Sequence, residues 1–190
     1  MVKNDQTAQN LRSAYAGESM AYQRYIAWGR KAKEEGFENV ALLFKAIANA
    51  EQVHAGNHFE AHGNVDGGFL VAGGGEFGYG TTSENLVGAI AGEEGEIEQM
   101  YPSYSLVAKD QGESDAVRSF HYSLEAEQIH AKLFRDAKEH VDNGEDIELE
   151  YVSICQVCGH TVVDDLPDKC PVCGEPKSKF RKFTKQIVAE

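Results

Sequence analysis

Apolar residues recur at helical spacing in four segments of this chain, and we expect each segment to form a helix. The segments cover roughly residues 4–34, 37–61, 82–110 and 113–141. One stripe of the first segment, with intervals of four, three, four and three, contains Leu11, Tyr15, Glu18, Tyr22 and Tyr25. A glutamate interrupts each of the four stripes, at Glu18, Glu51, Glu93 and Glu127. A buried carboxylate without a partner is costly, so these four side chains need a common explanation.

The expected helix ends coincide with residues that favour turns and caps. Gly36 and Gly112 each leave only a short turn between two helical segments, and Gly144 follows the last one. Thr81 and Glu84 have the spacing of a capping box at the start of the third segment. These signals predict two αα-hairpins.

A glycine-rich segment separates the two hairpins. Residues 63–80 include eight glycines, which is too many for a helix, and the segment is long for a turn. Its length suits a crossover that runs along a bundle. We therefore predict an all-α four-helix bundle with one long crossover, which leaves room for helices to be exchanged between subunits.

The composition and charge exclude several classes of protein. A hydrophobic content of 42% with 26% charged residues is typical of a soluble globular protein, and the longest purely apolar run, at 40–44, is too short to cross a membrane. The net charge is −14 on residues 1–150 and +1 on residues 151–190, which leaves no strongly basic surface for nucleic acid. The N-terminus lacks the apolar core of a secretory signal, so we expect a cytoplasmic protein.

The chain also contains an internal duplication. AEQVHA at 50–55 returns as AEQIHA at 126–131, an offset of 76 residues, and AGE at 16–18 returns at 91–93, an offset of 75. Each longer motif holds a Glu and a His three residues apart, which places both on one helical face. Two such helices, with one Glu from each of two others, provide the ligands of a carboxylate-bridged di-metal site. The predicted metal ligands are Glu18, Glu51, His54, Glu93, Glu127 and His130.

One residue breaks the symmetry between the two halves. Glu96 stands three residues after Glu93, where the first half has Ala21. Four carboxylates balance the charge of two Fe(II) ions, whereas two Fe(III) ions favour a fifth. We therefore expect Glu96 to bind metal mainly in the oxidised state; the alternative is an additional glutamate exposed to solvent.

Two tyrosines follow the glutamates of the AGE motifs. Tyr25 comes seven residues after Glu18, and Tyr101 comes eight after Glu93. A phenol can orient a carboxylate ligand by donating a hydrogen bond, and the alternative is a core or interface role. The remaining histidines lack a Glu partner at the required spacing, and we expect none of them to bind metal: His58, His62, His121, His140 and His160.

The four cysteines form two Cys-x-x-Cys pairs with eleven residues between them, at Cys155, Cys158, Cys170 and Cys173. Such clustering indicates a tetrahedral metal site and not a disulfide framework. Four thiolates bind zinc or iron, so a structural zinc ribbon is one interpretation. A redox-active iron fits better beside a di-metal site that needs electrons.

In combination, these motifs resemble the rubrerythrin family along nearly the whole chain: AGE, AEQVHA, AGEEGE followed by MYP, AEQIHA, and the CxxCG and CPxCG pairs. The resemblance implies a ferritin-like di-iron bundle at residues 1–148 and a C-terminal rubredoxin-like domain at residues 149–190, whose cysteines hold one iron. It also implies that the predicted glutamates and His130 bind two irons. His54 would exchange with Glu96 as one iron shifts on reduction, and Tyr25 and Tyr101 would assist the ligands.

The resemblance further implies a hydrogen peroxide reductase, a peroxidase of oxidative stress defence. Converting H2O2 to two waters takes two electrons, which a diferrous pair delivers together and the rubredoxin-like iron returns singly. The candidate catalytic residues are Glu51, Glu96, Glu127, Tyr25 and Tyr101. No GxGxxG motif follows an expected strand, so we expect NAD(P)H to act through a separate reductase.

The resemblance also suggests a rubredoxin-like tail that lies far from its own bundle centre and close to a neighbour's. We therefore expect a homodimer with electron transfer between subunits. Two other interpretations stay open, a ferritin-like ferroxidase or iron-handling protein and a zinc-ribbon interaction module. The first has no use for a four-thiolate electron port, and the second leaves the di-metal motifs unexplained.

Overall fold

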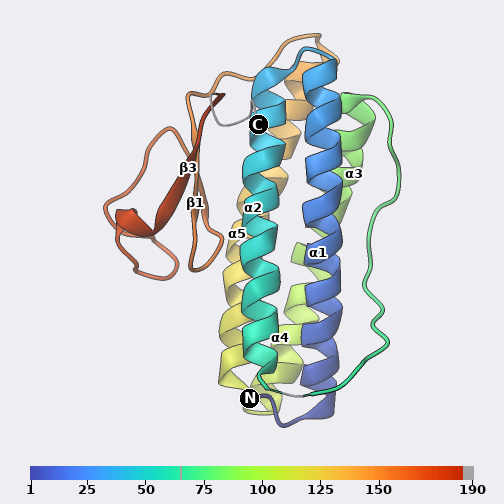
Figure 1. Ribbon diagram of the computed structural model, residues 1–190, viewed down its shortest axis with the longest axis vertical. Coiled ribbons are helices and arrows are strands. Elements are labelled where there is room, and N and C mark those ends of the chain that lie inside the picture. The colour runs from blue at the N-terminus through green and yellow to red at the C-terminus, as the bar shows by residue number, and fades with distance from the viewer. Residues whose placement is uncertain (65, 186–190) are drawn as a thin grey trace.

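The computed structural model describes residues 1–64 and 66–185, so position 65 of the crossover and the last five residues of the C-terminal domain lie outside the description. The helices form an elongated bundle with a small β domain against one side (Figure 1). The helical elements of the bundle are α1 (Asp5–Glu34), α2 (Glu38–His62), α3 (Thr82–Gly95), the π-helical turn η1 (Glu96–Met100), α4 (Tyr101–Asp110) and α5 (Ser114–Asp142). The prediction of a four-helix bundle with one long crossover is confirmed.

The turns and caps are formed by the residues that the sequence indicated. Gly36 and Gly112 have φ angles of 91° and 70°, a conformation that costs glycine little because it has no Cβ. At the start of α3 the backbone N–H of Glu84 donates to Thr81 Oγ1, and the backbone N–H of Thr81 donates to Glu84 Oε2 at 2.8 Å. The predicted capping box is therefore present.

The third predicted helix is not one continuous α-helix, and this corrects the sequence-based expectation. The π-helical turn η1 divides it into α3 and α4. A π turn holds about one residue more than an α turn. Because Tyr101 follows Glu93 by eight residues, and Tyr25 follows Glu18 by only seven, η1 absorbs the extra residue. Both tyrosines consequently face the bundle interior, where each is at most 2% exposed.

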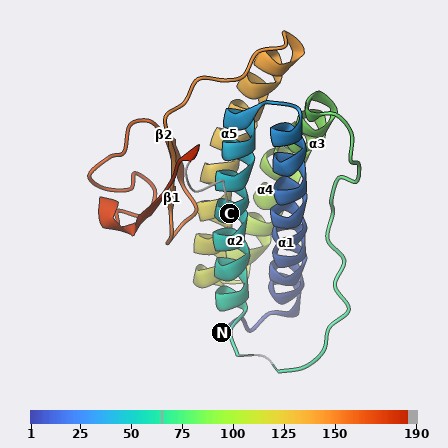
Figure 2. The same cartoon turned by 45° about the horizontal axis from the view of Figure 1, so that its top comes forward.

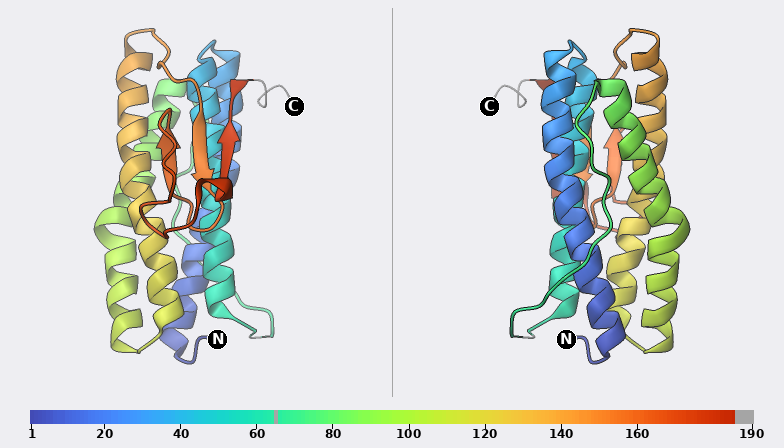
Figure 3. Two further views of the ribbon diagram at one scale, coloured as in Figure 1. Left: turned by 90° about the vertical axis from the view of Figure 1, so that its left-hand side faces the viewer. Right: turned by 90° about the vertical axis from the view of Figure 1, so that its right-hand side faces the viewer.

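The crossover between α2 and α3 runs along the outside of the bundle, beside α1 and then α3 (Figure 3, right). It lies close to α1, since a Cβ added at Gly73 would be 3.0 Å from Ala16 Cβ and 3.0 Å from the backbone N of Gly17. The indole N–H of Trp28 donates to the carbonyl of Gly78 at 2.9 Å. Glycine in this segment therefore permits a close approach between the crossover and the bundle.

The C-terminal domain consists of a small antiparallel sheet and two loops that carry the cysteines. The central strand β1 (Val152–Cys155) pairs with β2 (Thr161–Val163) on one side and β3 (Phe180–Phe183) on the other, and the short helix η2 (Lys177–Lys179) precedes β3. The sheet lies beside α2 and α5 (Figure 2). Val152, Ile154 and Phe183 belong to the same buried apolar cluster as Trp28, Phe44 and Phe134 of the bundle. The two parts therefore share a core, and a boundary at 148/149 stays a prediction.

Aromatic rings fill the centre of this shared core. Phe44 is fully buried and lies 5.0 Å from Phe134 and 5.8 Å from Tyr25 between ring centroids, with Trp28 at 6.1 Å. Offset and edge-on ring pairs of this kind add to the free energy of burial. Within the described residues, no helix combines the length and the apolar character that a membrane span requires.

Removing the central ring tests this packing. We expect Phe44→Ala to lower the free energy of unfolding by about 3–5 kcal/mol, because it leaves a cavity among rings that cannot collapse into it. Phe59→Ala, on the same helix but at a side chain that is 65% exposed, is the matched control and should change stability by less than about 0.5 kcal/mol. Denaturant unfolding followed by the fluorescence of Trp28 measures both variants. Equal losses in the two variants would contradict the assignment of the core.

Candidate metal centres

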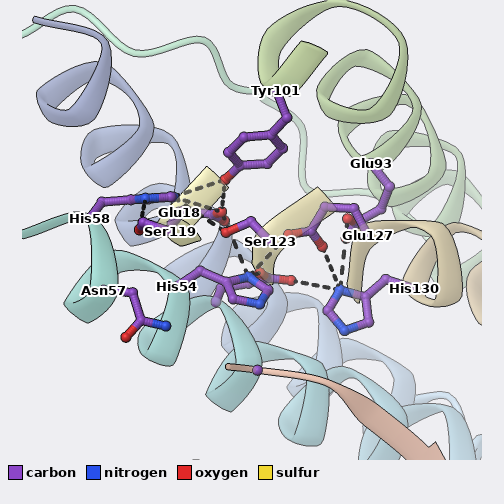
Figure 4. A network of polar contacts seen from close by, with 12 residues as sticks. Glu18, His54, Asn57, His58, Glu93, Tyr101, Ser119, Ser123, Glu127 and His130 are labelled. Carbon is purple, nitrogen blue, oxygen red and sulfur yellow. Dashed lines mark hydrogen bonds and ion pairs between the residues drawn. The ribbon is translucent and has the colours of Figure 1, made fainter. Parts of the chain in front are cut away.

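Four helices each direct one carboxylate into the middle of the bundle. Glu18 comes from α1, Glu51 from α2, Glu93 from α3 and Glu127 from α5, and none is more than 2% exposed. His54 and His130 follow one turn after Glu51 and Glu127, and both imidazoles are fully buried. Figure 4 shows the two imidazoles on the same side of the carboxylates. The duplicated sequence motif thus becomes a pseudo-symmetric cluster.

The cluster provides two overlapping groups of donor atoms. The first comprises Glu18, Glu51, His54 and Glu127, and the second comprises Glu51, Glu93, Glu127 and His130. Within each group the donor atoms lie within 4.8 Å of one another. Glu51 and Glu127 belong to both groups, as expected for carboxylates that bridge two metal ions. The structure therefore contains a carboxylate and histidine di-metal site.

Each histidine faces the carboxylates through Nδ1. His54 Nδ1 lies 2.9 Å from Glu51 Oε2 and 3.0 Å from Glu127 Oε1. His130 Nδ1 lies 2.7 Å from Glu127 Oε2 and 3.3 Å from Glu51 Oε1. The Nδ1 atoms are thus the ring nitrogens available as ligands, and the Nε2 atoms point toward the C-terminal domain.

Burial and close packing shift the pKa values of the carboxylates and histidines in this cluster. Burial, together with the charges of neighbouring carboxylates, raises the pKa values of Glu18 and Glu127 well above their usual range. Burial also acts to raise the pKa of Glu51, but His130 and His54 outweigh it and hold that pKa at about 2. Burial acts to lower the pKa of His130, yet Glu51 and Glu127 keep it well above the usual value.

These residues fit a pair of metal cations. Glu18 Oε2, Glu51 Oε1 and Glu127 Oε1 are buried without a hydrogen bond of their own in the described part of the chain, because the Nδ1 atoms near Glu51 Oε1 and Glu127 Oε1 lie closer to other carboxylate oxygens. Buried carboxylate oxygens without donors are costly, and metal ions would bind the oxygens directly and neutralise their charge. Oxygen and imidazole nitrogen ligands suit iron, manganese and zinc, so the donor set alone leaves the metal open.

Both predicted tyrosines donate a hydrogen bond to a carboxylate of the site. Tyr25 Oη donates to Glu93 Oε1 at 2.6 Å, and Tyr101 Oη donates to Glu18 Oε1. Burial and the surrounding carboxylates raise the pKa values of both phenols, so both remain protonated donors. Each phenol thus fixes the orientation of one carboxylate.

Glu96 is the one predicted ligand that the structure does not bring into a donor group. It begins the π turn η1, is partly buried, and lines a cavity beside the site together with Arg24. His54 occupies the corresponding donor group instead. Whether Glu96 binds metal in another state stays a prediction.

His58 takes part in the site without joining either donor group. Its Nε2 lies 3.1 Å from Tyr101 Oη, and its Nδ1 lies 2.7 Å from Ser119 Oγ. Burial, and to a lesser degree the charge of His54, lowers its pKa to about 3, so the ring is neutral. The sequence contained the relevant signal, because His58 follows His54 by four residues and therefore lies on the same helical face.

The four cysteines converge in the C-terminal domain. Cys155 Sγ lies 3.6 Å from Cys173 Sγ, and Cys158 Sγ lies 3.5 Å from Cys170 Sγ. Tetrahedral coordination with metal–sulfur bonds of about 2.3 Å requires sulfur atoms about 3.8 Å apart, so the thiols fit a single ion. A hydrogen bond from Cys158 lowers the pKa of Cys155 to about 5, and burial raises that of Cys173 to about 11. This is a four-cysteine metal site.

The loop after Cys158 lies directly on the two histidines of the bundle. Thr161 Oγ1 is 2.7 Å from His130 Nε2, and a Cβ at Gly159 would overlap the imidazole of His54. Asn57 Nδ2 donates to the carbonyl of Val157 at 3.0 Å, which fixes the same loop to α2. Sequence reasoning missed Thr161 and Gly159, since no pattern within the C-terminal segment indicates what it packs against.

This contact corrects one expectation. The C-terminal domain was expected far from its own bundle centre, but it packs against α2 and α5 of the same chain (Figure 3, left). Its first cysteine loop lies on His54 and His130 of the di-metal site. The shared apolar core explains the placement, because Val152, Ile154 and Phe183 are buried against bundle residues. The contact between the cysteine loop and the histidines of the bundle therefore lies within one chain.

Both the helical bundle and the C-terminal domain match models of known protein families. The family model named rubrerythrin matches residues 9–138, and the model of the rubrerythrin rubredoxin-like domain matches residues 154–181. Rubrerythrin-2 of Clostridium acetobutylicum is 49% identical over 182 residues, which cover 96% of this chain and 99% of that protein. Nigerythrin of Nitratidesulfovibrio vulgaris is 32% identical over 180 residues, covering 93% of this chain and 86% of the relative.

Solved structures show the same architecture. Nigerythrin in its fully reduced, all-ferrous state superimposes with a TM-score of 0.82 at 30% identity, over 95% of this chain and 88% of that one. A bacterioferritin of Mycobacterium tuberculosis has a TM-score of 0.65 at 16% identity, over 75% of this chain and 90% of its own, and so shares the bundle fold alone. The chain therefore belongs to the rubrerythrin family and carries the rubredoxin-like domain of that family at its C-terminus.

Proposed function

We propose that this protein reduces hydrogen peroxide to water at the di-metal centre, with iron in both centres. The observation that carries the proposal is the contact between the first cysteine loop and the two histidines of the bundle. A storage protein or a structural zinc ribbon does not need such a contact, whereas an enzyme that must be re-reduced does. The all-ferrous state of the related nigerythrin structure supports iron as the metal.

When bound, the two irons of the bundle supply two electrons per peroxide, and the four-cysteine iron supplies electrons one at a time. The protein holds and shields this chemistry. Glu51 and Glu127, which belong to both donor groups, would hold both metal ions, and Glu18, Glu93, His54 and His130 would each hold one of them. Tyr25 and Tyr101 hold Glu93 and Glu18 in place, and burial of the cluster excludes bulk water.

Reduction of one H2O2 to two waters also consumes two protons. A chain of hydrogen bonds leads from Glu18 through Tyr101 and His58 to Ser119. Ser119 lines a surface cavity of about 340 Å³, together with Asn57 and Arg118. These side chains provide a route along which protons from solvent reach the buried carboxylates.

Electrons reach the bundle along the covalent chain that follows Cys158. One route leads from Cys158 through Gly159 to His54, and a second passes through Thr161 to His130. We assign NAD(P)H as the ultimate donor, acting through a separate reductase, in a cytoplasmic homodimer. Because both contacts lie within one chain, each subunit of that dimer would be a complete unit for electron transfer.

The first test is a stopped-flow experiment on anaerobically reduced, iron-loaded protein. One equivalent of H2O2 per subunit should restore the visible absorbance of the ferric-thiolate centre rapidly, and faster than O2 does. An absent return, or a return that is faster with O2, would contradict peroxide reduction and favour the alternative of a ferroxidase or iron-handling protein.

Removing a bridging carboxylate should abolish turnover. We expect Glu51→Ala, and equally Glu127→Ala, to lose peroxidase activity and to bind less iron at the di-metal site, while the four-cysteine iron remains. Iron content and NAD(P)H-dependent peroxide consumption measure the two effects. Glu38→Ala is the control, since Glu38 lies on the same helix but is exposed and far along the chain from the site. Retained activity in either bridging variant would refute the site assignment.

Two glycines with the same backbone conformation allow the contact between the cysteine loop and His54 to be tested separately from the effect of backbone strain. Gly159 and Gly174 follow the two cysteine pairs with φ angles of 79° and 78°, but only Gly159 contacts the bundle, and a Cβ at Gly174 meets nothing within 4 Å. Alanine at either position should cost about 1–2 kcal/mol of backbone strain. We expect Gly159→Ala alone to slow the return of the ferric-thiolate absorbance after H2O2 is added.

The same two variants test the proposed electron transfer from Cys158 to His54 within one chain. Equal rates of absorbance return in Gly159→Ala and Gly174→Ala would contradict this route. So would recovery of activity when Glu51→Ala subunits are mixed with Cys158→Ser subunits, because that recovery requires electrons to pass between chains.

A further inference from the structure

A second cavity lies on the opposite side of the bundle from the cysteine domain. It has a volume of about 420 Å³ and is bordered by α1, the crossover and the π turn η1. Its lining includes Arg24, Gly75, Glu76, Glu96 and Gln99. The crossover covers this side of α1 (Figure 3, right). Apart from Glu96, no residue that lines this cavity takes part in metal binding or electron transfer as described above.

Arg24 is the notable side chain in this cavity. Its Nε and Nη1 atoms are buried and have no hydrogen-bond partner among the described residues. The guanidinium lies 5.9 Å from the ring centroid of Trp28, which stabilises its charge but accepts no conventional hydrogen bond. Buried donors without acceptors are costly, so the arrangement favours an accepting molecule in the cavity.

The crossover holds the guanidinium in place. A Cβ at Gly75 would lie 2.8 Å from Arg24 Nη1, so only glycine allows the backbone to approach so closely. Gly73 likewise packs against Ala16 and Gly17, which fixes the crossover to α1 near the AGE motif. The glycine-rich sequence of the crossover thus shapes this cavity as well as spanning the bundle.

The cavity adjoins the di-metal site through Glu96. This residue follows Glu93, a member of one donor group, by three positions. Glu96 Oε1 lies 3.9 Å from the Cβ position of Gly17, the residue before Glu18 of the other donor group. A molecule between Arg24 and Glu96 is therefore next to both groups.

The chemistry of the lining selects among small molecules. An anion would meet the carboxylates of Glu76 and Glu96 as well as the guanidinium. Dioxygen is a poor hydrogen-bond acceptor and has no proton to donate. Hydrogen peroxide is neutral, accepts hydrogen bonds through its oxygen lone pairs and donates through two O–H groups. It therefore matches a cavity in which two arginine nitrogens, Nε and Nη1 of Arg24, lack acceptors and the carboxyl group of Glu96 can accept.

We propose that Arg24 and Glu96 bind hydrogen peroxide in this cavity before it reaches the metal ions. A guanidinium N–H donates to one peroxide oxygen, and a peroxide O–H donates to a carboxyl oxygen of Glu96. The site makes the enzyme selective for peroxide over dioxygen. This inference rests on the proposed peroxide reduction and names the residues that recognise its substrate.

The kinetic test compares two oxidants on reduced, iron-loaded protein. Arg24→Met should lower the second-order rate constant for H2O2 by about tenfold, the loss expected for one charge-assisted hydrogen bond, and leave the constant for O2 unchanged. Arg24→Lys should lie between the wild type and Arg24→Met. Arg30→Met, on the same helix at an exposed position, is the matched control and should leave both constants unchanged. A purely structural role of Arg24 would change both constants in parallel.

A second measurement needs no turnover. In protein loaded with redox-inert zinc, the ¹⁵N–¹H signal of Arg24 Nε should shift saturably as H2O2 is added, while the signal of Arg30 Nε stays fixed. Gly75→Ala keeps the arginine but displaces its guanidinium, so this variant should weaken the shift and lower the H2O2 rate constant. It also provides the test if Arg24→Met does not fold, which Trp28 fluorescence would reveal.

The outcomes separate this inference from the function on which it rests. A wild-type protein that does not react with H2O2 would overturn both. A reactive wild type, with an unchanged ratio of H2O2 to O2 constants in Arg24→Met and Gly75→Ala and an unshifted Arg24 signal, would overturn the substrate site alone.

Discussion

The burial of four carboxylates in one cross-section of the bundle is the constraint on which the rest of the structure depends. Glu18, Glu51, Glu93 and Glu127 are almost completely buried and close together, and this arrangement is unfavourable without cations. The surrounding side chains reduce that cost, since His54 and His130 face the carboxylates and two phenols donate to them. A fold that would be strained without metal is thereby prepared to hold two metal ions.

The two halves of the bundle differ by one residue between the glutamate of the AGE motif and the tyrosine that follows it. Tyr25 and Tyr101 perform the same task in the two halves, although the second half has one more residue between glutamate and tyrosine. The π turn η1 takes up that residue and presents Glu96 beside the site, at the edge of the cavity that Arg24 lines. A departure from regular helix at this position thus makes the second half of the bundle differ from the first beside the di-metal site.

The apolar core couples the two metal centres. Strand β1 and Phe183 are buried against the bundle, and this packing sets the first cysteine loop on His54 and His130. Gly159 permits the close approach, and Thr161 orients His130 through the ring nitrogen that the metal would not use. The same hydrophobic contact that stabilises the small domain therefore also sets the distance between the two metal sites.

The sequence by itself determined the bundle, the crossover, the capping box and the residues of the two donor groups, because helical periodicity and the repeated motifs place those residues on known faces of single elements. It also contained the extra residue between Glu93 and Tyr101, without showing that a π turn accommodates it. Only the tertiary structure decided that Gly159 lies on His54, that His58 contacts Tyr101, and that Glu96 stands outside the donor groups. These contacts join elements far apart in the chain, and they cannot be predicted from periodicity, which shows only which face of a single element is buried.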